Sequence, residues 1–501
     1  MYKKILALVL AAIMVFSLAA CGGDKKSERK ANNEIIIGIG QDLGDSLNPY
    51  QMTAAGTKEI MTNVYEGLFK VTPAGEYVPA LVDRYEISDL GKMYRFILKD
   101  GIKFHNGKVM TAADVVYSFE TCKAITVDSS LPGVLEGAEI KAEGNDVIIT
   151  LPAANNDFFA YLSLVYIIPE GSSDSVVTAP IGTGPYKFAS RSVQENIVFE
   201  KFDEYWGQAA KLDKVTCNIY ENPTAMIAAL NAGAIDIAPH LTLDQVKGLG
   251  DNYSTLDDTM KLVQALYLNN GREPFNDIRV RQAICYALDV DEILQLTAEG
   301  HGAKLGSSIY PAFGKYFDES LVNKYPHSVE KAKELLTEAG YPNGFSMSVT
   351  VPSNYTPHVN VGQVIVRQLN EAGIKAELKE VEWETWLKDV YRGRDFDSTV
   401  TGFDASVLTA NALLQRWVST NSRNMINFNN GAYDSLISQA TAETDDAKRT
   451  ELYKEAEAIL SEYAANAYIQ DLPEYVAINS ELEGYTFYPL YKIDFSPISY
   501  K

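Results

Sequence analysis

Apolar residues between positions 180 and 238 follow the spacing of strands and then of a helix. A glycine- and proline-rich turn, PIGTGP, precedes three apolar runs of strand length, which begin at Tyr186, Ile197 and Val215. Asn222 stands where a helix cap is needed, and another strand-like run, Ala234 to Ala238, follows the helix. Strands that alternate with a helix in this way predict one layer of an α/β domain.

A second α/β unit is predicted further along the chain. Asp277 and Ser328 each precede apolar residues spaced at i, i+3, i+4 and i+7, which is the pattern of a helix with one buried face. Apolar runs of strand length follow at 345–351, at 375–381 and before Gly402. These helices are expected to pack on a second sheet.

The region between the first strand-like run, Glu34 to Ile39, and the turn at 180 has a pattern of its own. Tyr94, Phe96 and Leu98 stand at every second position, as in a hairpin strand, and Thr111 can cap a helix with Asp114 in the capping-box position. Because the chain leaves the first unit here and later returns to it, an inserted domain is predicted.

The N-terminus has the pattern of an export signal. Two lysines precede the apolar run Ile5 to Leu18, which has the length of a signal-peptide core. The run ends in LAACG, which resembles a lipobox, so lipidation of Cys21 is predicted; the alternative is an ordinary signal peptide with an incidental cysteine. Residues 22–33 are polar and are expected to form a flexible tether.

Composition narrows the classes of partner. The chain has 44 Lys and Arg against 66 Asp and Glu, a net charge of −22, which disfavours nucleic-acid binding. After Cys21 only Cys122, Cys217 and Cys285 remain, and we expect buried free thiols. About 480 residues after the signal exceed a single core, so two or three domains are expected.

The common catalytic motifs are absent from the sequence. It contains no Gly-x-Ser-x-Gly elbow, phosphate loop, His-Glu-x-x-His or Cys-x-x-Cys, and its five histidines lack the spacing of metal ligands. We therefore predict no enzyme activity, no cofactor and no metal bound by side chains.

Four long segments resemble one family, the extracellular solute-binding proteins of family 5, which are the oligopeptide-, dipeptide- and nickel-binding proteins of ABC importers. They are PIGTGPYKF with the residues up to Ala238, and the segments Tyr65 to Glu120, Tyr267 to Leu294 and Ala332 to Phe345. They occur in the order found in that family and span nearly all of the mature chain.

The resemblance implies an α/β fold like that of periplasmic binding proteins of the cluster C type, with two large lobes, a hinge and an extra inserted domain. We place the hinge near Gly184 and Leu266. The predicted division is a lipoprotein signal peptide at 1–20, a tether at 21–33, domain I at 34–64, 180–265 and 477–501, inserted domain II at 65–179, and domain III at 266–476.

The family binds its ligand between the large domains, and its peptide-binding members place an acid after a Gly-Trp pair to hold the peptide amine. Here the matching segment reads Gly402, Phe403, Asp404, Ala405, Ser406, with Ser406 in the place of the acid and Asp404 two residues away. The arginine of the dipeptide binders is also missing, because Pro352-Ser353-Asn354-Tyr355 occupies its place. A strict dipeptide ligand is therefore disfavoured, and longer peptides are favoured.

Aromatic and basic residues supply further candidates. Trp383 and Trp417 are candidates for a stacking wall, and Arg416 for binding an anionic group of the ligand. Tyr355 is a further candidate for ligand binding. The alternative is that each tryptophan packs in the core and that Arg416 lies solvated on the surface.

The sequence thus predicts a lipid-anchored substrate-binding protein of an ABC importer, on the outer face of the cell membrane, which binds oligopeptides and passes them to a permease with its ATPase. We expect a monomer. The alternatives are a receptor for an oligosaccharide or a metal chelate, and a signalling receptor for a solute.

Overall fold

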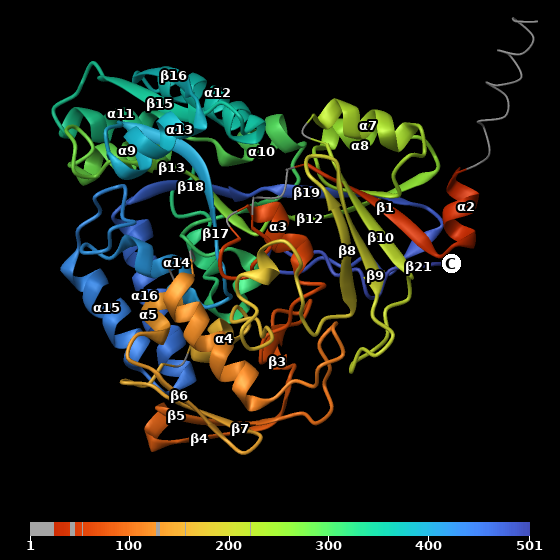
Figure 1. The fold of residues 1–501 in the computed structure, drawn as a ribbon. Coiled ribbons are helices and arrows are strands. Elements are labelled where there is room, and N and C mark those ends of the chain that lie inside the picture. Colours follow the sequence, from red (N-terminus) through yellow and green to blue (C-terminus); the bar gives the residue numbers. More distant parts are fainter. Residues whose placement is uncertain (1–24, 41–45, 53, 127–130, 156, 221) are drawn as a thin grey trace, which may run out of the picture.

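The computed structural model describes residues 25–40, 46–52, 54–126, 131–155, 157–220 and 222–501. The signal peptide predicted at 1–20 and the lipidation site predicted at Cys21 lie outside these residues. Three sheets with helices on their faces organise the described chain, as the α/β fold class requires (Figure 1).

The first sheet has seven strands and forms domain I. The PIGTGP turn leads into the hairpin at the edge of this sheet, as the sequence predicts. The strand β1 (Glu34–Ile39) pairs in parallel with β10 (Lys214–Ile219), so that Ile37 lies opposite Cys217. Its order is β12 (Tyr253–Thr259), β19 (Pro473–Asn479), β11 (Ile237–Leu241), β1 (Glu34–Ile39), β10 (Lys214–Ile219), β9 (Asn196–Lys201), β8 (Tyr186–Ser192). Helices α7 (Pro223–Asn231) and α8 (Leu243–Lys247) belong to the same unit, and Asn222 caps α7 by accepting the N–H of Thr224.

The second sheet has six strands and forms domain III. Its order is β14 (Ala303–Lys304), β18 (Asn466–Asp471), β13 (Leu262–Leu268), β17 (Ser398–Asp404), β15 (Ser346–Pro352), β16 (Lys375–Val381). Two separate buried clusters pack on it, and one of them receives the apolar faces predicted after Asp277 and Ser328. The main helices of the domain are α9 (Ile278–Ala287), α10 (Val290–Ala298), α11 (Val329–Glu338), α12 (Thr356–Glu371), α14 (Ala410–Leu414), α15 (Gly431–Ala442) and α16 (Asp446–Glu462).

The insertion contains a four-stranded sheet, which lies at the bottom of Figure 1. Its order is β4 (Val82–Ser88), β5 (Met93–Leu98), β7 (Asp146–Thr150), β6 (Glu139–Glu143), and α4 (Ala112–Ile125) packs on it. The side chain of Asp114 accepts the N–H of Thr111 at 2.9 Å and so completes the predicted capping box. The buried residues of this sheet belong to the same hydrophobic cluster as many of those of domain I, whereas the residues around α7 form a separate cluster.

The chain crosses between the two large sheets at positions that differ from the prediction. β12 belongs to domain I and β13 to domain III, so the first crossing is at Met260–Lys261 and not at 265–266. The second crossing is at Leu472, because β19 pairs in domain I. The two crossings lie side by side, with the N–H of Met260 donating to the carbonyl of Leu472 at 2.7 Å.

The second predicted hinge position, near Gly184, does not lie at a crossing between the two large sheets either. The N–H of Gly184 donates to the carbonyl of Val64, and a Cβ at position 184 would lie 2.4 Å from the carbonyl oxygen of Asn63. At Gly182 a Cβ would lie 2.1 Å from the carbonyl oxygen of Val64. The two glycines are required because the turn packs against backbone. This turn is a packed junction and not a crossing between lobes.

The flexible tether predicted at 21–33 is wrong for its last part. Lys25–Ala31 forms helix α2 (Figure 1). Arg29 on this helix is buried. The guanidinium of Arg29 donates to both carboxylate oxygens of Asp236, at 2.9 and 3.1 Å, and to the carbonyl of Gly233. Lys30 on the same helix also pairs with Glu481 at 3.1 Å. Polar contacts therefore dock a segment that lacks the large apolar side chains by which a packed helix is recognised.

Candidate ligand-binding site

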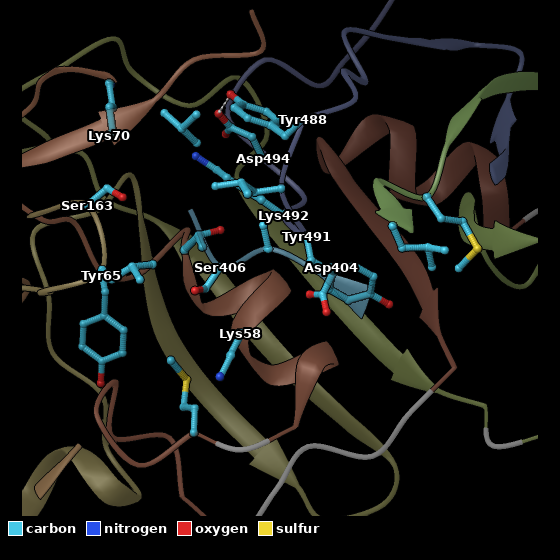
Figure 2. A pocket seen from close by; sticks show the side chains of 18 of the residues that line it. Lys58, Tyr65, Lys70, Ser163, Asp404, Ser406, Tyr488, Tyr491, Lys492 and Asp494 are labelled. Carbon is cyan, nitrogen blue, oxygen red and sulfur yellow. Dashed lines mark hydrogen bonds between the residues drawn. The ribbon is translucent and has the colours of Figure 1, made fainter. Parts of the chain in front are cut away.

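A cavity of about 1000 Å³ lies between domain III on one side and domains I and II on the other. Domain III contributes the end of β17 and the aromatic residues around Trp383, and domain I contributes the C-terminal segment 486–497. The remaining wall comes from α3 (Ala55–Met61), β2 (Phe69–Val71) and the residues around them. Figure 2 shows that side chains from these separate segments surround one space.

The segment Gly402 to Ser406 lies on the cavity wall in full. β17 pairs with β13 so that Phe403 is opposite Val263 and Asp404 is opposite Leu262. Asp404 is exposed and, among the described residues, no side chain donates a hydrogen bond to its carboxylate. Its carboxylate is therefore available to a cationic group of a ligand.

Aromatic side chains form the wall beside this segment. Trp383 stacks on Trp386 with ring centroids 5.2 Å apart and an angle of 7° between the planes, and Tyr355 meets Trp383 edge to face. The indole N–H of the buried Trp386 donates to Thr399 at 2.9 Å, which fixes its ring. Tyr355 and Trp383 line the cavity, so they present apolar faces to it.

Trp417 and Arg416 do not line the cavity, contrary to the prediction. Trp417 is buried, donates its indole N–H to Ser308 at 2.7 Å and packs against Phe403 from behind. The Arg416 guanidinium carbon lies 4.0 Å from the centre of the Phe403 ring, and its Nη1 donates to Tyr391 at 3.0 Å. Both residues therefore support Phe403 and Tyr391, which do line the cavity.

The sequence patterns missed the charged residues of the opposite wall. Lys58, Lys70, Glu66, Lys492 and Asp494 all line the cavity. Glu66 and Lys70 come from the inserted region and Lys492 and Asp494 from the C-terminal return, so no local motif joins them. The only signal for the C-terminal pair was the expectation that 477–501 returns to domain I.

The two acids of that wall are held by protein donors. Glu66 is buried and accepts hydrogen bonds from Thr183 at 3.0 Å, Tyr205 at 2.8 Å and Trp206 at 2.7 Å. Its pKa is raised by burial, against which these donors act. Asp494 accepts the hydroxyl of Tyr488 at 2.8 Å and the N–H of Ser496 at 2.9 Å. Burial by itself would raise the pKa of Asp494. The charge of Lys492 and the hydrogen bonds from Tyr488 and Ser496 lower this pKa by more, so it lies below its usual value.

His358, which also lines the cavity, is neutral at physiological pH. Its Nδ1 lies 2.8 Å from the amide nitrogen of the buried Gln264, and burial lowers the pKa of its imidazole to about 4. Within the part of the chain that the structure describes, no group of three His, Cys, Asp or Glu side chains is placed to hold a metal ion. None of the described helices has both the length and the apolar character to cross a membrane.

Comparison with known proteins places this geometry in one family. Residues 76–425 match the family described as bacterial extracellular solute-binding proteins, family 5. Among curated relatives, the dipeptide-binding protein of Escherichia coli is 27% identical over 499 residues, which cover 91% of this chain and 92% of that protein. The heme-binding protein A of Haemophilus influenzae is 28% identical over 457 residues, 82% of each chain.

Solved structures have the same fold over most of their length. The substrate-binding protein CtaP of Listeria monocytogenes aligns with a TM-score of 0.85 and 24% identity, over 93% of this chain and 99% of that one. DppA of Helicobacter pylori, solved with the peptide STSA, aligns with a TM-score of 0.78 and 25% identity, over 93% and 98%. Since the family match also spans more than half of the sequence, the chain belongs to the bacterial extracellular solute-binding proteins of family 5.

Proposed function

We propose that this protein is the lipid-anchored substrate-binding protein of an ABC importer and that it binds oligopeptides in the cavity between its two large sheets. It then delivers the peptide to a permease and its ATPase and catalyses no reaction itself. The observation that carries the proposal is the cavity itself, in which the unpaired carboxylate of Asp404 lies beside the aromatic wall of Tyr355 and Trp383.

The size and chemistry of the cavity favour peptides longer than two residues. Its volume of about 1000 Å³ is at the upper end of the range for small-molecule sites, roughly 300–1000 Å³. A peptide amine needs an acid when it is buried, because an unpaired buried charge is costly, and Asp404 meets this need. Ser353, which stands where dipeptide binders have their arginine, does not line the cavity.

An oligosaccharide is the second candidate. Tyr355 and Trp383 line the cavity, and flat aromatic rings stack well on the apolar faces of sugars. Sugars carry no charge, however, and would leave Asp404 without a partner. The metal chelate and the signalling role are further alternatives, and a permease and ATPase gene pair beside this gene would favour transport over signalling.

Peptide binding is tested by capture from a mixture. The mature protein is unfolded to release bound molecules, refolded, and incubated with a tryptic digest of serum albumin or, separately, with a mixture of cello-oligosaccharides. Native mass spectrometry should show one retained peptide of more than two residues per protein molecule. Retention of an oligosaccharide in place of any peptide would contradict the proposal.

The anchor is tested at Cys21. Replacing it with serine removes the thiol that would carry the lipid, so we expect the variant to move from the membrane fraction to the soluble fraction. Cys285→Ser changes the same atom at a buried position and should stay with the membranes. If Cys21→Ser remains in the membrane fraction as fully as the wild type, the lipid anchor is not at this residue.

A further inference from the structure

Three lysines line the cavity of a protein whose overall charge is strongly negative. Lys58, Lys70 and Lys492 face it from α3, from β2 and from the C-terminal segment. Among the residues that the structure describes, no carboxylate forms an ion pair with any of the three. Other lysines are paired, such as Lys108 with Asp114 and Lys304 with Asp291.

The acids that line the cavity offset the charge of these lysines only in part, because none of them forms a direct ion pair with a lysine of the cavity in the described chain. The cavity is lined by three carboxylates, Glu66, Asp404 and Asp494. The oxygens of Glu66 are held by Thr183, Tyr205 and Trp206, and those of Asp494 by Tyr488 and Ser496. Figure 2 shows that Asp404 lies beside Tyr491, on the other side of the pocket from the space into which Lys492 extends.

Lys492 is the most enclosed of the three lysines. Its side chain is half-buried, its Nζ lies 4.5 Å from the centre of the Tyr488 ring, and Figure 2 shows it directed toward the side of the pocket where Lys70 lies. Burial lowers the pKa of Lys492, and the positive charge of Lys70 lowers it further. The negative charges of Asp494 and Glu66 raise this pKa, but the net direction is down. A carboxylate arriving from a ligand would relieve the incomplete neutralisation of this ammonium.

We propose that Lys492, with Lys70 next to it, forms a subsite that binds a carboxylate of the ligand, at the opposite side of the cavity from Asp404. The proposal rests on the proposed function, because it assigns the second charged end of a bound peptide. The ligand class is then a peptide with a free amine at Asp404 and a carboxylate at Lys492. That carboxylate comes either from the C-terminus or from an acidic side chain.

The first test compares a tryptic digest of serum albumin with the same digest after every carboxylate has been converted to an amide. We expect the wild type to retain peptides from the untreated digest and to bind the treated ones roughly tenfold to a hundredfold more weakly, as for a lost charge-assisted hydrogen bond. Lys492→Gln should lose most of this preference. Lys141→Gln, which removes an exposed lysine of β6, should keep it.

The second test identifies the source of the carboxylate. One retained peptide is synthesised as the free acid, as the C-terminal amide, and with each acidic side chain replaced by its amide, and binding is measured by calorimetry. One of the amide forms should lose affinity for the wild type but not for Lys492→Gln. The carboxylate that was removed in that form is the one that binds at Lys492. Lys70→Gln should show the same pattern with a smaller change.

The outcomes separate this proposal from the proposed function. If the wild type binds untreated and amidated peptides equally well, or if Lys492→Gln discriminates as the wild type does, the carboxylate subsite is wrong while peptide binding stands. If neither digest yields a retained peptide, the proposed function fails and the subsite fails with it. Thermal unfolding midpoints equal to that of the wild type would show that both lysine variants are folded.

Discussion

Replacing Asp404 with asparagine is expected to weaken peptide binding by roughly tenfold to a hundredfold. The substitution keeps the shape of the side chain and removes the one carboxylate of the cavity that has no donor among the described residues. A hydrogen bond to a charged group contributes on the order of 1.5–3 kcal/mol, and each 1.4 kcal/mol changes affinity tenfold. Calorimetric titration with a peptide retained in the capture experiment measures the change.

Two controls show whether the lost contact is with the amine. Acetylation of the peptide's N-terminus should weaken its binding to the wild type about as much as the Asp404→Asn substitution weakens binding of the free peptide. For Asp404→Asn, acetylation of the peptide should cause little further loss of affinity. Asp251→Asn removes the same charge from an exposed turn and should leave the affinity unchanged. If Asp404→Asn binds peptide as the wild type does while Phe403→Ala does not bind it, amine anchoring at Asp404 is wrong and stacking is favoured.

Local patterns were sufficient for several regular elements of the fold, though not for helix α2. The cap at Asn222, the capping box at Thr111 and the apolar faces after Asp277 and Ser328 all depend on residues a few positions apart. Each element is therefore encoded within its own segment. The positions where the chain crosses between domains are not encoded in this local way. The strands β12 and β13 are separated by only two residues, and they differ only in the sheet in which each one pairs.

Contacts between distant segments explain what the sequence did not reveal. Arg29 and Asp236 lie 207 positions apart, and Lys30 and Glu481 lie 451 apart, so a run that looked like a free tether docks through ion pairs to distant segments. Lys492 and Lys70 come together only because the C-terminal segment returns across domain I. Trp417 follows β17 closely in sequence, yet its indole packs behind Phe403 and not beside it, because a pattern along the chain does not fix the direction of a side chain after a turn.

The protein is expected to lose stability as the pH rises from 6.5 to 8.5, and Glu457 and Asp471 together account for on the order of 3 kcal/mol of this loss. Burial raises the pKa of Glu457 to about 8 and that of Asp471 to about 7. Folded molecules therefore keep these protons at a pH where unfolded molecules release them, and each group costs about 1.4 kcal/mol per pH unit until its folded pKa is passed.

His240 adds to the same loss. Burial alone would lower its pKa, but Glu59, 2.7 Å from its Nε2, and Glu474, 2.8 Å from its Nδ1, raise the pKa well above the usual value. The stability that this protonated histidine provides is fully present below about pH 6.5, its unfolded pKa, and is lost as the pH rises toward the folded pKa. Burial lowers the pKa of His105 and His358 to about 4, so both are neutral in folded chains across this range. In unfolded chains they lose their remaining protons just above pH 6.5, which opposes the loss by only a small amount.

Urea unfolding between pH 6.5 and 8.5 tests this expectation, with Glu457→Gln as the informative variant. The amide keeps an oxygen to accept the Ser307 hydroxyl, which lies 2.5 Å from Glu457, and it carries no proton to release. Its free energy of unfolding should therefore fall less steeply than that of the wild type, by about 1.4 kcal/mol per pH unit up to pH 8. Glu451→Gln, at an exposed position of the same helix α16, should keep the slope of the wild type. A wild-type stability that is constant or rises across this range would contradict the protonated state of Glu457, and so would equal slopes for the wild type and Glu457→Gln.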